Sequence, residues 1–129
     1  MLKLLVRTVL VAAALSAMAA LPARAADPAK VAQTAKGATL VDDHGMTLYT
    51  FDKDPAGKSA CNGKCAKAWP PLMAGNGAQP AGDWSIVTRA DGSKQWAYKG
   101  QPLYTWVKDK KPGDVTGDGV RKVWHVAKP

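Results

Sequence analysis

LYTFDKD, residues Leu48–Asp54, returns in the same chain as LYTWVKD at Leu103–Asp109. The two copies lie 55 residues apart, and the same offset relates Trp69 to Trp124. Internal similarity at a fixed spacing is the mark of a repeated supersecondary unit, and a single unit of this size cannot bury its apolar face alone. We therefore expect two half-domains that share one core.

Short extended runs separated by turn residues predict strands along most of the chain. The runs at 38–41 and 46–51 flank the turn DDHG, which predicts a hairpin. The second half continues as a meander through 84–89, 94–98 and 101–106, and a closing strand is expected within 120–127. Residues Ala26–Gly37 are expected to form a short lead-in arm.

These patterns predict a mainly β fold. We expect a single small domain of two duplicated β-hairpin-plus-loop repeats related by pseudo-twofold symmetry, with one short helix near Cys61–Trp69 for which Ser59 could be the cap. The expected division is repeat one at about 36–73, a Gly- and Pro-rich linker at 74–83, and repeat two at about 84–129.

The first 25 residues have the features of a secretory signal peptide. Lys3 and Arg7 precede the apolar run Thr8–Leu21, and Ala23-Arg24-Ala25 is a small-x-small cleavage site. The alternative is a retained membrane anchor, but the run is short for a span. We expect a mature chain that begins at Ala26 and is periplasmic or secreted.

Charge gives only weak information about partners. The chain from residue 26 onward has 15 basic and ten acidic residues, a net charge of +5, and its lysines are spaced singly. We expect no nucleic acid partner. A basic surface could bind anionic envelope polymers or lipid headgroups, but lysines that keep a β-rich monomer soluble and protect its strand edges are the preferred interpretation.

Each copy of the repeated stretch has two aromatic residues at alternate positions and an Asp three residues later. The aromatics share one face of a strand, and the Asp can accept hydrogen bonds from loop amides or a tyrosine hydroxyl. Aromatic core and turn-organising Asp are the preferred roles; two sites for a sugar or a cationic ligand are the alternative. The residues concerned are Tyr49, Phe51, Asp54, Tyr104, Trp106 and Asp109.

This pattern resembles a known family, the secreted-repeat lipoproteins marked by Tyr-x-aromatic-x-x-Asp. The resemblance runs from about Lys36 to Pro129 and is carried by GMTLYTFDKD, GKSACNGKCAKAWPPL, TRADGSKQWAYKGQPLYTWVKD and PGDVTGDGVRKVWHVAKP. It implies an exported bacterial envelope protein of tandem repeats, and the family has no assigned activity. No cysteine lies near the signal cleavage site, so we expect no lipid tether to the membrane after cleavage.

Cys61 and Cys65 are the only cysteines. In an oxidising compartment a structural disulfide is the simplest outcome for two cysteines this close. A redox dithiol is an alternative, although the spacing differs from C-x-x-C. A Cu(I) site is another, in which both cysteines would bind the metal together with His44 or His125, or with Met46 or Met73.

Catalytic patterns are weak. Asp114–Gly119 resembles the first half of a calcium loop, but the twelfth position is His125 rather than Glu, so an Asp- and Gly-rich turn is preferred. We expect no cofactor and a non-enzymatic binding or structural module of the envelope. A periplasmic copper-binding or redox accessory protein using Cys61 and Cys65 is the second hypothesis, and a small cell-wall glycan hydrolase acting through its Asp residues is the third.

Overall fold

The computed structural model describes residues 27–129. The secretory signal predicted for residues 1–25 lies outside the described residues, as does Ala26. Among the residues that are described, no helix combines the length and the apolar character that a membrane span needs.

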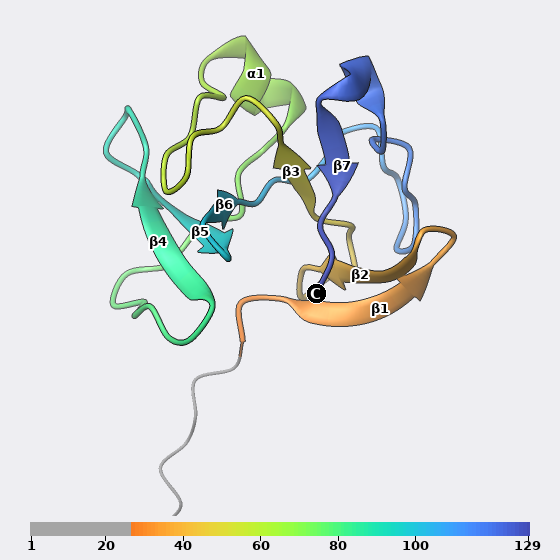
Figure 1. Ribbon diagram of the computed structural model, residues 1–129, viewed down its shortest axis with the longest axis horizontal. Coiled ribbons are helices and arrows are strands. Elements are labelled where there is room, and N and C mark those ends of the chain that lie inside the picture. The colour runs from red at the N-terminus through yellow and green to blue at the C-terminus, as the bar shows by residue number, and fades with distance from the viewer. Residues whose placement is uncertain (1–26) are drawn as a thin grey trace, which may run out of the picture.

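The fold is mainly β and forms one small domain of two repeats, with a single short α-helix in the described range 27–129, as predicted. Two antiparallel sheets, β1–β2 and β4–β5–β6, lie on either side of the central pair β3–β7 (Figure 1). The strands are β1 (Lys30–Thr34), β2 (Gly37–Val41), β3 (Tyr49–Phe51), β4 (Trp84–Thr88), β5 (Lys94–Tyr98), β6 (Gln101–Pro102) and β7 (Trp124–Val126).

The two copies of the motif meet at their tyrosines. The Tyr49 N–H donates to the Tyr104 carbonyl at 2.7 Å, and the Tyr104 N–H donates to the Tyr49 carbonyl at 3.0 Å. A residue that pairs reciprocally with its own counterpart lies next to a twofold axis. The pseudo-twofold axis of the molecule therefore passes between these two residues.

The repeats also exchange their last segments. β3 of repeat one pairs with β7, which comes from the end of repeat two. In the symmetric position, the Thr105 N–H donates to the Pro70 carbonyl at 2.8 Å, and the Val107 N–H donates to the Ala68 carbonyl at 3.1 Å. The motif strand of each repeat is thus completed by the segment that ends the other repeat.

Two local expectations need correction. The lead-in expected over Ala26–Gly37 contains β1, which pairs with β2 along its whole length. The expected hairpin between 38–41 and 46–51 is reduced to a Val41–Thr47 bridge, a bond from the Leu48 N–H to the Leu40 carbonyl and the bonds around the turn, because the Leu40 N–H donates instead to the Ala127 carbonyl. The β4–β5–β6 meander of the second half agrees with the prediction.

The helix α1 (Lys64–Ala68) lies within the predicted segment. Its expected cap is wrong: the N-cap is Gly63, and no side chain caps the helix. The Ser59 hydroxyl lies instead 2.7 Å from that of Tyr104. In repeat two a short 3-10 turn, η1 (Val120–Lys122), takes the place of α1, and both elements lie at the same end of the molecule (Figure 1).

The core has two parts because strand side chains alternate between the two faces. Leu48 and Leu103 lie in an aliphatic cluster that also contains Ala29, Leu40 and Ala127. Their neighbours along the chain lie in the other cluster, which is mostly aromatic and is the one beside α1 and η1. Its buried members are Tyr49, Cys61, Trp69, Tyr104, Trp124 and Val126.

Candidate binding cleft

Four aromatic rings form a continuous stack across the pseudo-twofold axis. Trp69 and Trp124, which are equivalent in the two repeats, lie at the centre with ring centroids 3.8 Å apart and planes 3° apart. Phe51 stacks on the outer face of Trp124 at 4.2 Å, and Trp106 stacks on the outer face of Trp69 at 3.9 Å. The strand exchange produces this order, because each Trp is carried to the motif strand of the opposite repeat.

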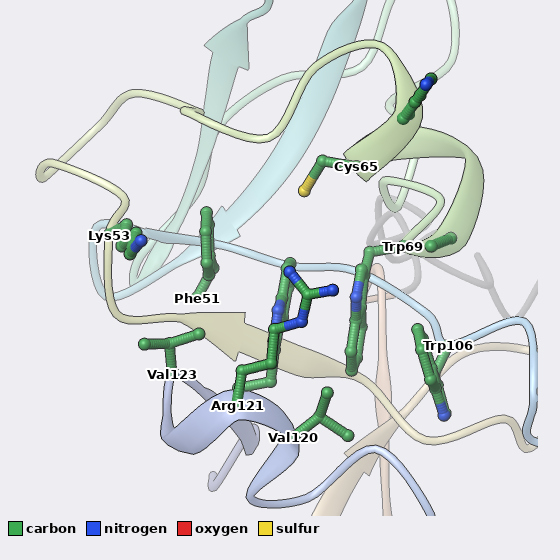
Figure 2. A pocket seen from close by; sticks show the side chains of 11 residues that line it. Phe51, Lys53, Cys65, Trp69, Trp106, Val120, Arg121 and Val123 are labelled. Carbon is green, nitrogen blue, oxygen red and sulfur yellow. The ribbon is translucent and has the colours of Figure 1, made fainter.

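A cleft of about 340 Å³ opens beside the stack, and all four rings line it. α1 contributes Cys65 and Ala68 to one side, while Val120 and Val123 line the other side at η1. Figure 2 shows Cys65 on one side and Val120 and Val123 on the other, across the labelled rings, which are seen edge-on. The cleft therefore lies on the axis, between two elements that occupy equivalent places in the repeats.

Every ionisable side chain that lines the cleft is basic. These are Lys53, Lys64 and Arg121, and the described residues place no Asp in the lining. A further ammonium, that of Lys108, lies 5.8 Å from the Trp106 ring centroid, within the range of a cation–π contact. The charged side chains at this opening therefore all carry the same, positive sign, which favours an anion there.

The backbone beside the cleft is strained in repeat two. Arg121 has φ 50° and Lys122 has φ 60°, so two successive residues other than glycine are in the left-handed region. Each such residue costs on the order of 1–3 kcal/mol and persists only when the surrounding structure holds it there. α1, the counterpart of η1 in repeat one, contains no such residue within the described chain.

Beneath the stack, tyrosines and aspartates of the motif form crossed pairs. The Tyr49 hydroxyl donates to Asp109 at 2.6 Å, and the Tyr104 hydroxyl donates to Asp54 at 2.6 Å. Each tyrosine of one repeat thus bonds to the aspartate of the other. Both tyrosines are fully buried, and their rings lie edge-on against Trp69 and Trp124.

Burial governs the ionisation of these groups. It raises the pKa of both the Tyr49 and the Tyr104 hydroxyl, and the hydrogen bond to an aspartate raises each pKa further. Burial also raises the pKa of Asp54, although the bonds from Tyr104 and from the Ala60 N–H oppose the shift. The phenols therefore stay protonated and act as permanent donors to the carboxylates.

On the Asp54 side a buried arginine extends the network. Arg89 is 6% exposed and donates to the Ser59 hydroxyl at 3.0 Å, to the Gln95 side-chain oxygen at 2.7 Å and to the Cys61 carbonyl at 2.6 Å. All of these acceptors are neutral. The positive charge of Arg89 lowers the pKa of Asp54, a smaller effect than burial.

On the Asp109 side small residues take the equivalent place. Thr116 donates both its N–H and its hydroxyl to Asp109, at 3.0 and 2.6 Å. The Gly117 N–H donates to the Tyr49 hydroxyl at 3.2 Å. A Cβ at Gly117 would lie 2.8 Å from the Tyr49 ring and 2.9 Å from the Trp69 ring, so the backbone here is in direct contact with both rings.

Cys61 and Cys65 form a disulfide, as expected. Cys61 is fully buried in the aromatic cluster, whereas Cys65 lines the cleft. The bridge joins the loop before α1 to the first turn of the helix. It thus closes the cleft on the side of repeat one.

The residues of the copper hypothesis take other partners. Both sulfur atoms are bonded to each other in the disulfide. The His44 Nδ1 lies 3.1 Å from the Asp43 Oδ1, and the His125 Nε2 lies 2.8 Å from the Asp52 Oδ2. A Cu(I) site on the two cysteines would first require their reduction. Asp42, Asp43 and His44 lie close together in an exposed turn, in which the Asp42 carboxylate accepts the N–H groups of His44 and Met46.

The carboxylates of the loop Asp114–Gly119 accept hydrogen bonds from backbone N–H groups. Asp114 accepts the N–H groups of Lys110 and Lys111, and Asp118 accepts the Val126 N–H at 3.0 Å. These are the bonds of an Asp-rich turn, the role preferred for this loop over a calcium site.

The residues that line the cleft were mostly absent from the sequence-based set. Phe51 and Trp106 belong to it as motif members and Cys65 as a disulfide partner, but Lys53, Lys64 and Arg121 do not. The equivalence of Trp69 and Trp124 was the available signal. A residue that recurs in both repeats can meet its own counterpart on a twofold axis, and this pair does so.

Fold and cleft together define a class: an interlocked tandem-repeat β protein with an aromatic cleft on its axis. The chain belongs to the family described as a secreted repeat of unknown function, whose model matches residues 30–73 and 85–128. Membership supports an exported protein. Neither a curated protein nor a solved structure matches the chain.

Proposed function

We propose that this protein is a non-enzymatic binding module of the cell envelope and that the axial cleft is its ligand site. The observation that carries the proposal is the ring stack itself. Four aromatic side chains from both repeats line one opening of about 340 Å³. An apolar cleft with a few charged groups at its rim is the common form of a small-molecule site.

The chemistry around the cleft favours binding over catalysis. Asp54 and Asp109, the acids of the hydrolase hypothesis, are each hydrogen bonded to a buried tyrosine and to a loop N–H. The ionisable side chains that line the cleft are Lys and Arg, and within the described residues the lining contains no Asp or His that could act as a general acid or base.

The ligand site can be tested by NMR with a library of small organic compounds. Compounds that bind should shift the indole N–H signals of Trp69, Trp106 and Trp124. Ala68→Leu puts a larger side chain into the cleft and should abolish these shifts. Ala66→Leu, on the same helix but outside the lining, is the matched control and should retain them.

Two outcomes would contradict the proposal. Shifts that survive in Ala68→Leu would place the site elsewhere. A diverse library in which no compound shifts the three indole signals would argue against a binding role for the cleft.

The proposed route to the envelope is a signal peptide in residues 1–25 that is cleaved on export, leaving a periplasmic or secreted protein. Mass spectrometry of protein recovered after export should then give a chain that begins at Ala26. A chain that retains residues 1–25 would contradict this route.

A further inference from the structure

The inner rings of the stack present only their edges to the cleft. Trp124 has Phe51 on one face and Trp69 on the other, and Trp69 has Trp124 on one face and Trp106 on the other. Both rings nevertheless line the cleft. Since their faces are covered, their edges must form its floor.

Ring edges carry the positive part of the aromatic quadrupole, and the faces carry the negative part. A floor of edges therefore attracts negative charge and disfavours a cation, which would need an open face. This disfavours the cationic ligand that the motif residues could suggest from sequence.

The rim adds full positive charges of the same sign. Within the described residues, Lys53, Lys64 and Arg121 take part in no ion pair with an Asp, whereas Lys36 and Lys111 do. Three cations beside an opening without acids repel one another, and an anion between them would relieve that repulsion. Charge complementarity thus identifies the missing partner as negative.

Arg121 is the cation that the backbone places most specifically. Its left-handed conformation is followed by that of Lys122, and in Figure 2 its side chain extends in front of the ring stack between Phe51 and Trp69. A guanidinium in this place can bind a carboxylate or phosphate through two parallel hydrogen bonds. The cost of the strained backbone is consistent with a functional position for this group.

The cleft is also apolar along its sides, where Ala68, Val120 and Val123 line it. An inorganic anion would leave this surface uncovered. The ligand that fits both features has an apolar body and one anionic group.

We propose that the cleft binds a small amphipathic organic anion, with its apolar body across the ring edges and its anionic group at Arg121. This inference rests on the proposed ligand site. Lys53 and Lys64 add to the positive potential at the rim, and Arg121 makes the direct contact.

Three probes with the same body and different charge test the proposal: naphthoate, naphthalenemethanol and naphthylmethylammonium. Titrations of residues 26–129 with its disulfide intact, followed by calorimetry and by the indole N–H signals, should give the order anion, neutral alcohol, cation. We expect naphthoate to bind about ten-fold more tightly than the alcohol, the value of one charge-assisted contact. The preference should decrease with added salt.

Arg121→Gln should remove most of this preference, because the direct contact is lost while Lys53 and Lys64 remain. It should leave the affinity for naphthalenemethanol within about two-fold, because the apolar floor is retained. Lys99→Gln is a matched control, since Lys99 is also an exposed cation with φ 50° but lies outside the cleft lining. It should keep the preference.

The outcomes separate the two proposals. If the indole N–H shifts give the same affinity for all three probes, the preference for an anion is refuted, while the cleft remains a ligand site. An unchanged preference in Arg121→Gln would refute the role of Arg121. If library compounds bind in the cleft but naphthoate does not, the proposal of an anionic ligand is refuted. If neither the library compounds nor the probes bind, the proposal that the cleft is a ligand site is refuted.

Discussion

The two ends of the crossed tyrosine–aspartate arrangement are built from the same motif and closed in different ways. Around Asp54 and Tyr104, the closing groups are bulky: an apolar disulfide and the buried, charged Arg89. Around Asp109 and Tyr49, Thr116 donates to the carboxylate and Gly117 is packed against the rings. The repeated residues therefore determine the fold, while the residues that are not repeated determine how tightly each end is packed.

The largest effect is expected at Gly117. In Gly117→Ala the new methyl group would overlap the buried rings of Tyr49 and Trp69, and neither ring can move without disturbing the stack. We expect a loss of about 3 kcal/mol in the free energy of unfolding, measured by chemical denaturation. Gly75→Ala meets nothing within 4 Å and should change it by less than about 0.5 kcal/mol.

A small loss of unfolding free energy in Gly117→Ala would show that there is free space around Gly117 at the Asp109 end. The comparison between a tightly packed end and a network-filled end would then be wrong.

Removing either tyrosine hydroxyl should cost less free energy of unfolding than Gly117→Ala, and the two costs should differ. Tyr49→Phe removes a donor from Asp109, which is 7% exposed, so a buried carboxylate loses one of its three donors. We expect a cost of about 2 kcal/mol in the free energy of unfolding. Tyr104→Phe removes the donor to Asp54, which is more exposed, and should cost about 1 kcal/mol.

Urea denaturation of both variants at the same pH makes the comparison. Equal costs, or a larger cost for Tyr104→Phe, would mean that the Arg89 network contributes more to stability than the burial of Asp109.

The smallest effect is in the pH dependence of stability, and its sign should differ between two aspartates. Hydrogen bonding from the Val126 N–H lowers the pKa of Asp118. Its contribution is present above the unfolded pKa of about 3.9 and is lost as the pH falls through the folded pKa. Burial raises the pKa of Asp54, so its ionised form costs stability that is regained as the pH falls towards about 3.9.

Denaturation midpoints measured between about pH 6 and pH 3 should show the difference. Asp118→Asn should reduce the loss of stability in acid, and Asp54→Asn should increase it. The same direction of change in both variants would contradict the opposite environments described for these two carboxyl groups.

Sequence reasoning predicted the elements better than their partners. Alternation along KQWAY, the turn ADGS and the short segment before Pro70 were enough to place β5, its turn and α1, because side-chain periodicity and turn chemistry are local properties. Which strand lies beside β3 is not local. The pattern of Leu48, Tyr49 and Thr50 shows the two faces of the strand, but it contains no information on its hydrogen-bonded neighbour.

The same limit applies to the candidate site. Hydrogen bonds from a tyrosine hydroxyl to an aspartate could be expected from the motif, but their crossing between repeats depends on the strand exchange. No feature of the sequence indicates that Arg121 lies at the cleft. A left-handed conformation is usually expected at glycine, and an arginine in a loop is normally a solvated charge. The cleft could therefore be found only once both repeats were in place.

The exchange of end segments has a consequence for the origin and assembly of the molecule. Trp124 reaches its place beside Phe51 only as part of the other repeat, so one repeat alone has half a ring stack and an unpaired motif strand. A chain of a single repeat would be expected to complete itself with a second copy, as an isologous dimer. The segment 74–83 that joins the repeats then acts as a tether, which replaces an encounter between two molecules by one within a single chain at an effective concentration on the order of millimolar.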